Sequence, residues 1–102
     1  MAHRAVDDQQ NQTASESPRV TVRYWAAARA AAGVDEETIF GRNVAEVLTA
    51  AVRAHDGDLR FERVLRLSSI LVGEAPVGTR ELETVVVESG DVLEILPPFA
   101  GG

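Results

Sequence analysis

Residues 89–102 read Ser-Gly-Asp-Val-Leu-Glu-Ile-Leu-Pro-Pro-Phe-Ala-Gly-Gly, and this stretch decides the fold because it leads a strand straight into a terminal diglycine. The Ser-Gly-Asp sequence at 89–91 is typical of a turn. Apolar and polar side chains then alternate over 92–96, which is the period of a strand with one buried face. The alternation directs Leu93 and Ile95 toward a core and the remaining side chains outward. We therefore predict a final strand at 92–96 with one covered face.

The residues after this strand predict a projecting tail. Pro97 and Pro98 cannot donate backbone hydrogen bonds to a neighbouring strand, so the chain must leave the sheet in an extended form. Gly101 and Gly102 lack Cβ atoms and can pass through a narrow channel. The terminal carboxylate is ionised at neutral pH and can attack the α-phosphate of ATP to form a mixed anhydride. Residues 97–102 are therefore predicted to be a flexible functional tail.

The rest of the chain supplies short strands and one strongly patterned helix. Asn43 and Glu46 occupy the positions of an N-terminal capping box, and apolar residues then recur at helical spacing to about His55. Residues 84–87 are apolar enough for a short strand or a docked loop, and the sequence leaves both open. The pattern also predicts strands at 20–25, 35–40, 69–72 and 75–77, and shorter helices at 26–32 and 58–65.

These elements predict a single α+β domain, a mixed sheet with one main helix packed on one face. A chain of 102 residues is enough for one modest core. Residues 1–18 are rich in Gln, Ser, Asp and Ala and cannot bury enough apolar surface to offset the entropy of ordering, so we expect a disordered N-terminal tail. The folded domain should span 19–96.

Composition narrows the classes of function. The net charge of −6 disfavours nucleic acid and anionic membranes as partners and suggests a basic protein partner. The chain has no cysteine, and its two histidines, His3 and His55, have no metal-ligand spacing, so we expect no metal site and take both to be exposed. No apolar run is long enough for a membrane span or a secretory signal, so we expect a cytoplasmic protein.

Three segments together resemble the small, sulfur-carrier subunit of molybdopterin synthase. They are Val22-Arg23-Tyr24-Trp25-Ala26 with Arg29 and Gly33, the helix capped by Asn43, and the ending 90–102 with its Gly-Asp turn and Leu-Pro-Pro-x-x-Gly-Gly. The resemblance covers nearly everything from Arg19 onward. It implies a ubiquitin-like β-grasp fold in which the first and last strands are parallel neighbours at the centre of the sheet.

The resemblance also implies a reaction cycle. An adenylating enzyme of the ubiquitin-activating type would use ATP to form an acyl-adenylate on Gly102, and a sulfur donor would convert it to a thiocarboxylate. The large subunit of the synthase would then take in the tail and pass the sulfur to a cyclic pyranopterin phosphate precursor. The chain would bind no cofactor by itself, and without a basic cluster it is poorly suited to hold the phosphate alone.

A docking patch beside the tail is the second predicted site. Alternation leaves Leu96 facing outward, and Trp25 on the first strand points to the same face, with Arg29 nearby. Aromatic, arginine and apolar side chains are the usual composition of an interface hot spot, although Trp25 could instead fold into the core. The predicted partner-binding residues are Trp25, Arg29, Leu96, Pro97, Pro98, Phe99 and Ala100, and the reacting residues are Gly101 and Gly102.

Three other functions fit the same pattern. The chain could carry sulfur for thiazole or cysteine synthesis, although the double proline favours the molybdopterin route. It could be a protein modifier joined to lysines of target proteins, or a β-grasp binding module with an inert end. Phe99, which replaces a smaller aliphatic residue, is a departure from the family pattern, but it leaves the diglycine unchanged.

Overall fold

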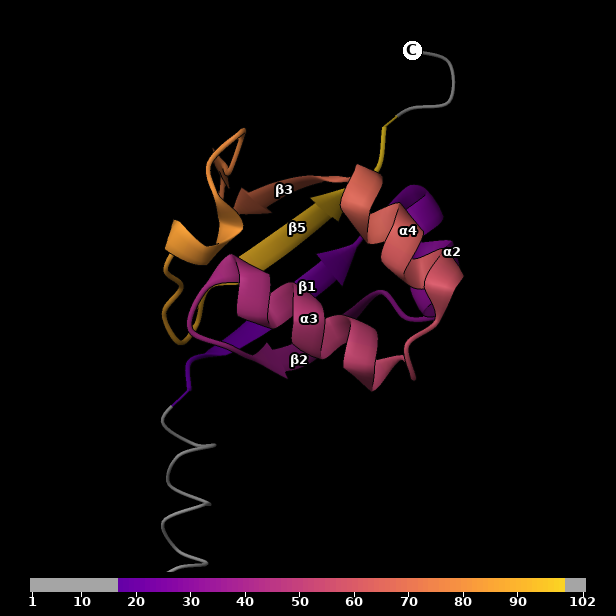
Figure 1. The fold of residues 1–102 in the computed structure, drawn as a ribbon, viewed down its shortest axis with the longest axis horizontal. Coiled ribbons are helices and arrows are strands. Elements are labelled where there is room, and N and C mark those ends of the chain that lie inside the picture. The colour runs from indigo at the N-terminus through magenta and orange to yellow at the C-terminus, as the bar shows by residue number, and fades with distance from the viewer. Residues whose placement is uncertain (1–16, 99–102) are drawn as a thin grey trace, which may run out of the picture.

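Two segments from opposite ends of the domain form the middle of the sheet. β1 (Arg19–Tyr24) and β5 (Val92–Leu96) are parallel neighbours, with Val22 opposite Leu93 and Tyr24 opposite Ile95. The structure is a computed structural model that describes residues 17–98, and its strand order is β2-β1-β5-β3-β4 (Figure 1). The predicted parallel pairing of the first and last strands is therefore confirmed.

The remaining strands are antiparallel to this central pair. β2 (Glu36–Phe40) pairs with β1, and β3 (Ser69–Val72) pairs with β5 so that Ser69 lies opposite Leu96. The two-residue β4 (Ala75–Pro76) completes a hairpin with β3 through the Gly73-Glu74 turn. The sheet is mixed, as predicted from the sequence.

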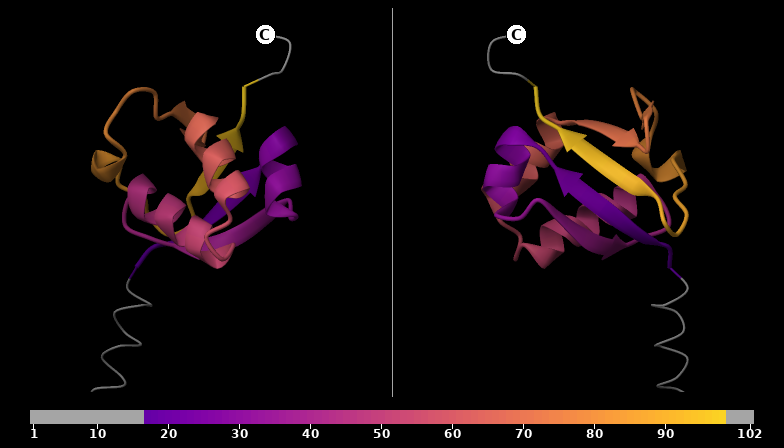
Figure 2. Two further views of the ribbon diagram at one scale, coloured as in Figure 1. Left: turned by 45° about the vertical axis from the view of Figure 1, so that its right-hand side comes forward. Right: turned by 180° about the vertical axis from the view of Figure 1, so that it is seen from behind.

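Helices cover one face of this sheet. The main helix α3 (Val44–Ala54) crosses the front of the sheet, and α4 (Leu59–Leu67) and α2 (Ala26–Ala32) lie together at one end (Figure 1). The view from behind shows the other face of the sheet without a covering helix (Figure 2). This arrangement confirms the predicted α+β class and the ubiquitin-like β-grasp fold.

Local sequence signals explain where α3 and α4 begin. The side chain of Asn43 accepts a hydrogen bond from the Glu46 amide at 2.8 Å, and the Glu46 carboxylate accepts one from the Arg42 amide at 2.9 Å. Asp58 caps α4 by accepting from the amides of Arg60 and Phe61. The predicted capping positions are therefore correct, and α4 continues two residues beyond the predicted end at residue 65.

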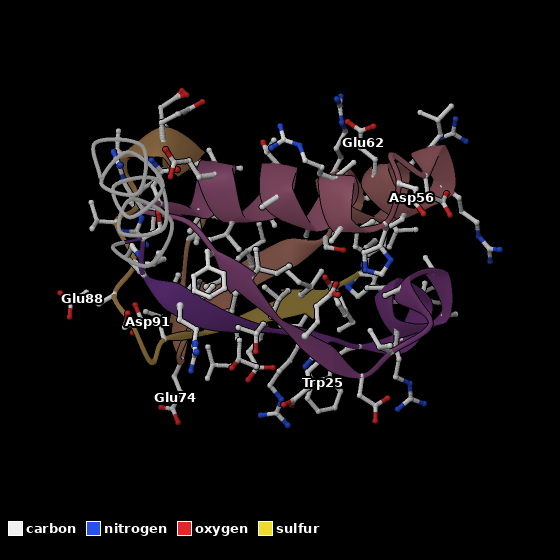
Figure 3. All side chains as sticks on the ribbon, turned by 90° about the horizontal axis from the view of Figure 1, so that it is seen from below. Trp25, Asp56, Glu62, Glu74, Glu88 and Asp91 are labelled. Carbon is white, nitrogen blue, oxygen red and sulfur yellow. The ribbon has the colours of Figure 1, made fainter. Side chains whose placement is uncertain are left out.

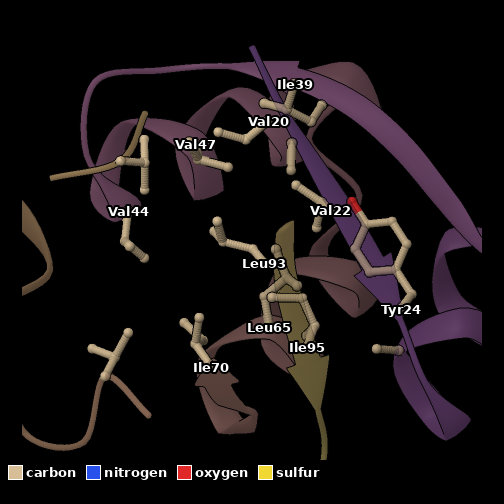
Figure 4. Packing of buried hydrophobic residues seen from close by; sticks show 14 of the residues in the cluster. Val20, Val22, Tyr24, Ile39, Val44, Val47, Leu65, Ile70, Leu93 and Ile95 are labelled. Atoms are coloured by element: carbon tan, nitrogen blue, oxygen red, sulfur yellow. The ribbon is translucent and has the colours of Figure 1, made fainter. Parts of the chain in front are cut away.

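Alternate residues of the central strands fill the core. Val20, Val22, Tyr24, Leu93 and Ile95 are all at most 2% exposed and face the helices (Figure 4). Phe61 of α4 is fully buried among them.

Gly41 is needed where β2 turns toward α3, because a Cβ atom there would lie 2.8 Å from a Val47 methyl and 2.9 Å from its amide nitrogen. Any larger residue at this position would push the main helix away from the sheet.

Polar contacts join Tyr24 and His55 beneath the helices, so the expectation that His55 is exposed is wrong. The His55 ring packs on Phe61 with 4.2 Å between centroids, and its Nε2 lies 2.6 Å from Glu37 Oε2. The Tyr24 hydroxyl donates to the same Glu37 oxygen at 2.5 Å. Burial, followed by this contact with Glu37, raises the pKa of the Tyr24 phenol far above its usual value.

The segment at 84–87 is a docked loop and not a strand of the sheet. A short 3₁₀ turn, η1 (Leu82–Thr84), precedes it, and its ladder contact is a single bridge between Val86 and Asn43. Val85 and Val87 are buried while Val86 is 72% exposed, which explains the apolar sequence. The predicted tail at 1–18 lies outside the described residues except for Ser17 and Pro18.

Candidate functional site

The root of the C-terminal tail is the end of β5, a central strand of the sheet. β5 has a hydrogen-bonded neighbour on each side, and its Leu93 and Ile95 side chains are fully buried. Leu96 and Pro97 are half-buried, and Pro98 is exposed. Burial thus decreases residue by residue as the chain leaves the sheet. The predicted tail residues Phe99, Ala100, Gly101 and Gly102 lie outside the described residues.

Trp25 stands beside this exit on the open face of the sheet. Its amide donates to the Ile95 carbonyl at 3.2 Å, so its backbone is fixed to the end of β5. The indole is 44% exposed and points away from α3 (Figure 3), and its Nε1 donates to Glu94 Oε1 at 2.6 Å. The alternative in which Trp25 belongs to the core is therefore wrong.

The backbone is strained at the residue that follows Trp25. Ala26, directly after Trp25, adopts a φ of 50°, a left-handed conformation that costs a non-glycine residue about 1 kcal/mol. The turn redirects the chain from β1 into α2, so that Trp25 remains at the strand end while the helix begins immediately.

Charged residues of three strands form a row next to the indole. The Arg23 guanidinium lies 3.6 Å from Glu36 and 3.5 Å from Glu94, and it lies 5.5 Å from the centre of the Trp25 ring. Arg23 therefore joins an aromatic contact to two ion pairs. Because Arg23 and Glu36 are exposed and Glu94 is partly exposed, these ion pairs should contribute little to stability and mainly orient Trp25.

The Arg29 side chain makes a different ion pair. It lies on α2, and its guanidinium is 3.6 Å from Asp35 Oδ1. The structure thus brings Trp25 close to the strand end that carries Leu96, while Arg29 has a different partner. Leu96 is less exposed than expected because the antiparallel neighbour Ser69 lies beside it.

Arg23 and Glu94 are the residues of this site that the sequence analysis missed. The alternation over residues 20–25 places Arg23 on the same face as Trp25, so the sequence could have indicated Arg23. Its contact with Glu94 also depends on the register between β1 and β5, which the sequence does not give.

Metal binding and membrane insertion find no support within residues 17–98. No three His, Asp or Glu side chains in that range gather closely enough to hold a metal ion. None of the helices in the same range has both the length and the apolar character needed to cross a bilayer.

Solved structures with the same fold give the clearest comparison. Small archaeal modifier protein 1 from Methanosarcina acetivorans has a TM-score of 0.71 and 23% identity, over 85% of this chain and 99% of its own. A protein described as subunit 1 of the molybdopterin converting factor from Pyrococcus furiosus has a TM-score of 0.65 and 26% identity, over 81% and 100%. Both superpose over nearly their whole length.

A third match is a complex. The complex of subunits 1 and 2 of the molybdopterin-converting factor from Helicobacter pylori contains a chain with a TM-score of 0.56 and 22% identity, over 82% of this chain and 99% of its own. No protein-family model matches the sequence, and the search of curated proteins found no match. The structural matches share the β-grasp fold of this chain. The chain has a ubiquitin-like β-grasp fold and is similar in structure to small archaeal modifier protein 1 and to subunit 1 of the molybdopterin-converting factor.

Proposed function

We propose that this chain carries sulfur on the carboxyl group of Gly102 for the synthesis of molybdenum cofactor. The observation that carries the proposal is the course of the chain at its end. A central strand with one fully buried face leads through half-buried Pro97 to exposed Pro98, and Gly101 and Gly102 follow in the sequence. A rigid support with a narrow, side-chain-free end suits delivery into another protein's active site.

The proposed chemistry needs two steps on one carboxyl group. An oxygen of the Gly102 carboxylate attacks the α-phosphate of ATP, so that pyrophosphate leaves and an acyl-adenylate forms. Hydrosulfide supplied by a sulfur donor then attacks the acyl carbon, AMP leaves, and the thiocarboxylate remains after loss of one proton. An adenylating enzyme of the ubiquitin-activating type would supply the ATP site.

The proposed acceptor reaction takes place in a complex with a large subunit. The match to subunit 1 of a two-subunit converting factor supports such a partner. The large subunit would provide the pocket for the cyclic pyranopterin phosphate and its acid and base groups. This chain would contribute the tail and, through Trp25, Leu96 and the adjoining prolines, the surface that holds it.

Mass spectrometry tests this proposal. Incubation with the adenylating enzyme, ATP and a sulfide source should raise the mass by about 16 Da, because sulfur replaces one oxygen. A variant with one alanine added after Gly102 should show no transfer of sulfur to the precursor while keeping the fold, because the reactive carbon moves by up to about 3.5 Å. Unprocessed extended protein that remains active would disprove the terminal mechanism.

A second function is a protein modifier. The match to small archaeal modifier protein 1 favours it, because activation of Gly102 would be the same and only the acceptor would differ. An amine of a target lysine would attack the acyl group in place of sulfur. Conjugates in cell lysate that disappear when Gly102 is deleted would identify this function, and their absence alongside active sulfur transfer would exclude it.

A further inference from the structure

The end of α4 forms a second border of the tail root, opposite Trp25. β1 and β3 lie on either side of β5, so the residues that follow β1 and precede β3 flank its end. Trp25 follows β1, while Leu67 is the last residue of α4 and comes just before Ser69, the partner of Leu96. Leu67 is 66% exposed, an uncovered aliphatic side chain beside the exit.

Exposed arginines occupy the same helix. Arg60, Arg63 and Arg66 recur every three residues along α4, which keeps them on one broad side of the helix. Arg66 contacts Glu62 at 3.0 Å, whereas Arg60 and Arg63 make no ion pair with any residue in 17–98. This positive surface stands out in a chain of net charge −6.

One group of acidic residues lies at the other end of the sheet. Glu74, Glu88 and Asp91 lie together there (Figure 3), near the turns that precede β5 and follow β3. Asp56 and Glu62 lie at the α4 end (Figure 3), so the arginines of α4 form a local positive surface and not one pole of the molecule. A partner that docks beside the tail is in contact with this local charge.

A groove opens next to the same corner. It has a volume of about 640 Å³, and Leu48, Val52 and Leu65 contribute to its apolar wall. Arg66, Ser68 and Ser69, the residues around Leu67, form one border of it. An apolar side chain of a partner that covers Leu67 could therefore continue into this groove, with a charged group of the partner near Arg66.

We propose that Leu67, Arg63 and Arg66, here called the α4 corner, dock the large subunit that receives the tail, and that the large subunit's surface beside its tail channel is apolar with a carboxylate border. This inference rests on the proposed function. It replaces the basic partner expected from net charge with a locally acidic one, because the charge next to the contact governs complementarity.

Two leucines of one helix provide a matched test. Leu67 and Leu59 are the two ends of α4 and are 66% and 74% exposed, so glutamate at either position should leave the fold intact. We expect Leu67→Glu to weaken binding to the large subunit at least about tenfold in titration calorimetry. Leu59→Glu should bind like the unaltered protein. Circular dichroism verifies that both variants are folded.

Charge reversal tests the second part of the proposal. Arg63→Glu should slow association with the large subunit about tenfold at low salt, and the difference should shrink as salt is added. Arg42→Glu makes the same change of charge on an exposed residue outside α4 and should have a clearly smaller effect. Equal effects of the two reversals would mean that net charge, and not the α4 corner, steers the encounter.

The outcomes separate this inference from the proposed function. If the unaltered protein does not bind the large subunit, the proposed function fails. If it binds and Leu67→Glu binds equally well, the α4 corner is wrong while the proposed function stands. If Leu67→Glu binds the large subunit normally but no longer binds the adenylating enzyme, the α4 corner serves the adenylating enzyme and the assignment to the large subunit is overturned.

Discussion

The two faces of β5 differ in burial and in polarity. Leu93 and Ile95 point to the helices and are fully buried, whereas Glu94, between them in sequence, points to the open face and contacts Trp25 and Arg23. One strand thus carries the centre of the core on one side and a polar support for an exposed indole on the other. Substitutions on the two sides should have different kinds of effect.

The difference explains how one face of the sheet can keep exposed side chains in a small protein. The inner face supplies enough burial to hold β5 in place without help from the outer face. The outer face is then free to keep exposed aromatic and charged groups whose contribution to stability is small. We expect the following substitutions to sharpen this division, beginning with the largest effect.

Leu93→Ala should cause the largest loss of stability. Removing a fully buried leucine from the central strand leaves a cavity that its neighbours fill only in part, so the free energy of unfolding should fall by about 2–5 kcal/mol. Urea unfolding followed by circular dichroism measures this. Leu59→Ala, at an exposed site, should change it by less than about 0.5 kcal/mol. Similar losses in the two variants would contradict the inner-face role.

Tyr24 should make stability depend on pH in the alkaline range. The folded protein raises the pKa of the phenol above the unfolded value of 10.0, so unfolded chains lose the proton first. The free energy of unfolding is unaffected by this group below that pH and should fall by about 1.4 kcal/mol per pH unit above it. Urea unfolding between about pH 9 and 11 tests this, and Tyr24→Phe should remove this component of the slope. An unchanged slope in Tyr24→Phe would rule out the phenol as its source.

Glu94→Ala should have the smallest effect on stability and a clear effect on Trp25. The exposed ion pair with Arg23 is worth about 1 kcal/mol or less, so unfolding should change little. Loss of the acceptor for the indole Nε1 should shift the fluorescence of Trp25, the single tryptophan of the chain. Glu36→Ala removes the other partner of Arg23 and should leave the emission nearly unchanged. Equal changes in emission in Glu94→Ala and Glu36→Ala would contradict a specific hydrogen bond between Glu94 and the indole.

Local signals made the helices and strands predictable. Asn43 with Glu46 and Asp58 before Phe61 give the starts of α3 and α4, because capping depends on neighbouring residues alone. The alternation in β1 and β5 correctly gives their buried faces. Local sequence could not show whether residues 84–87 form a strand or a loop. Val85 and Val87 face the core from a loop, and the position of this loop depends on contacts with Asn43 and Arg42.

Contacts between distant segments limited the prediction of the site. The outward position of Trp25 follows from alternation, but its bond to Glu94 depends on the register between β1 and β5. The α4 corner depends on the pairing of Leu96 with Ser69, two residues after Leu67, which no local pattern indicates. The position of Arg29 near Asp35 likewise required the turn between α2 and β2.

The parallel pairing of β1 with β5 also has a consequence for biosynthesis on the ribosome. The first strand to be made has its central partner in the last one, so the sheet cannot close until nearly all of the domain has been synthesised. A chain that ends before residue 92 lacks both the middle of the sheet and the strand that presents the tail. Such truncated chains should therefore remain unfolded and sensitive to proteases.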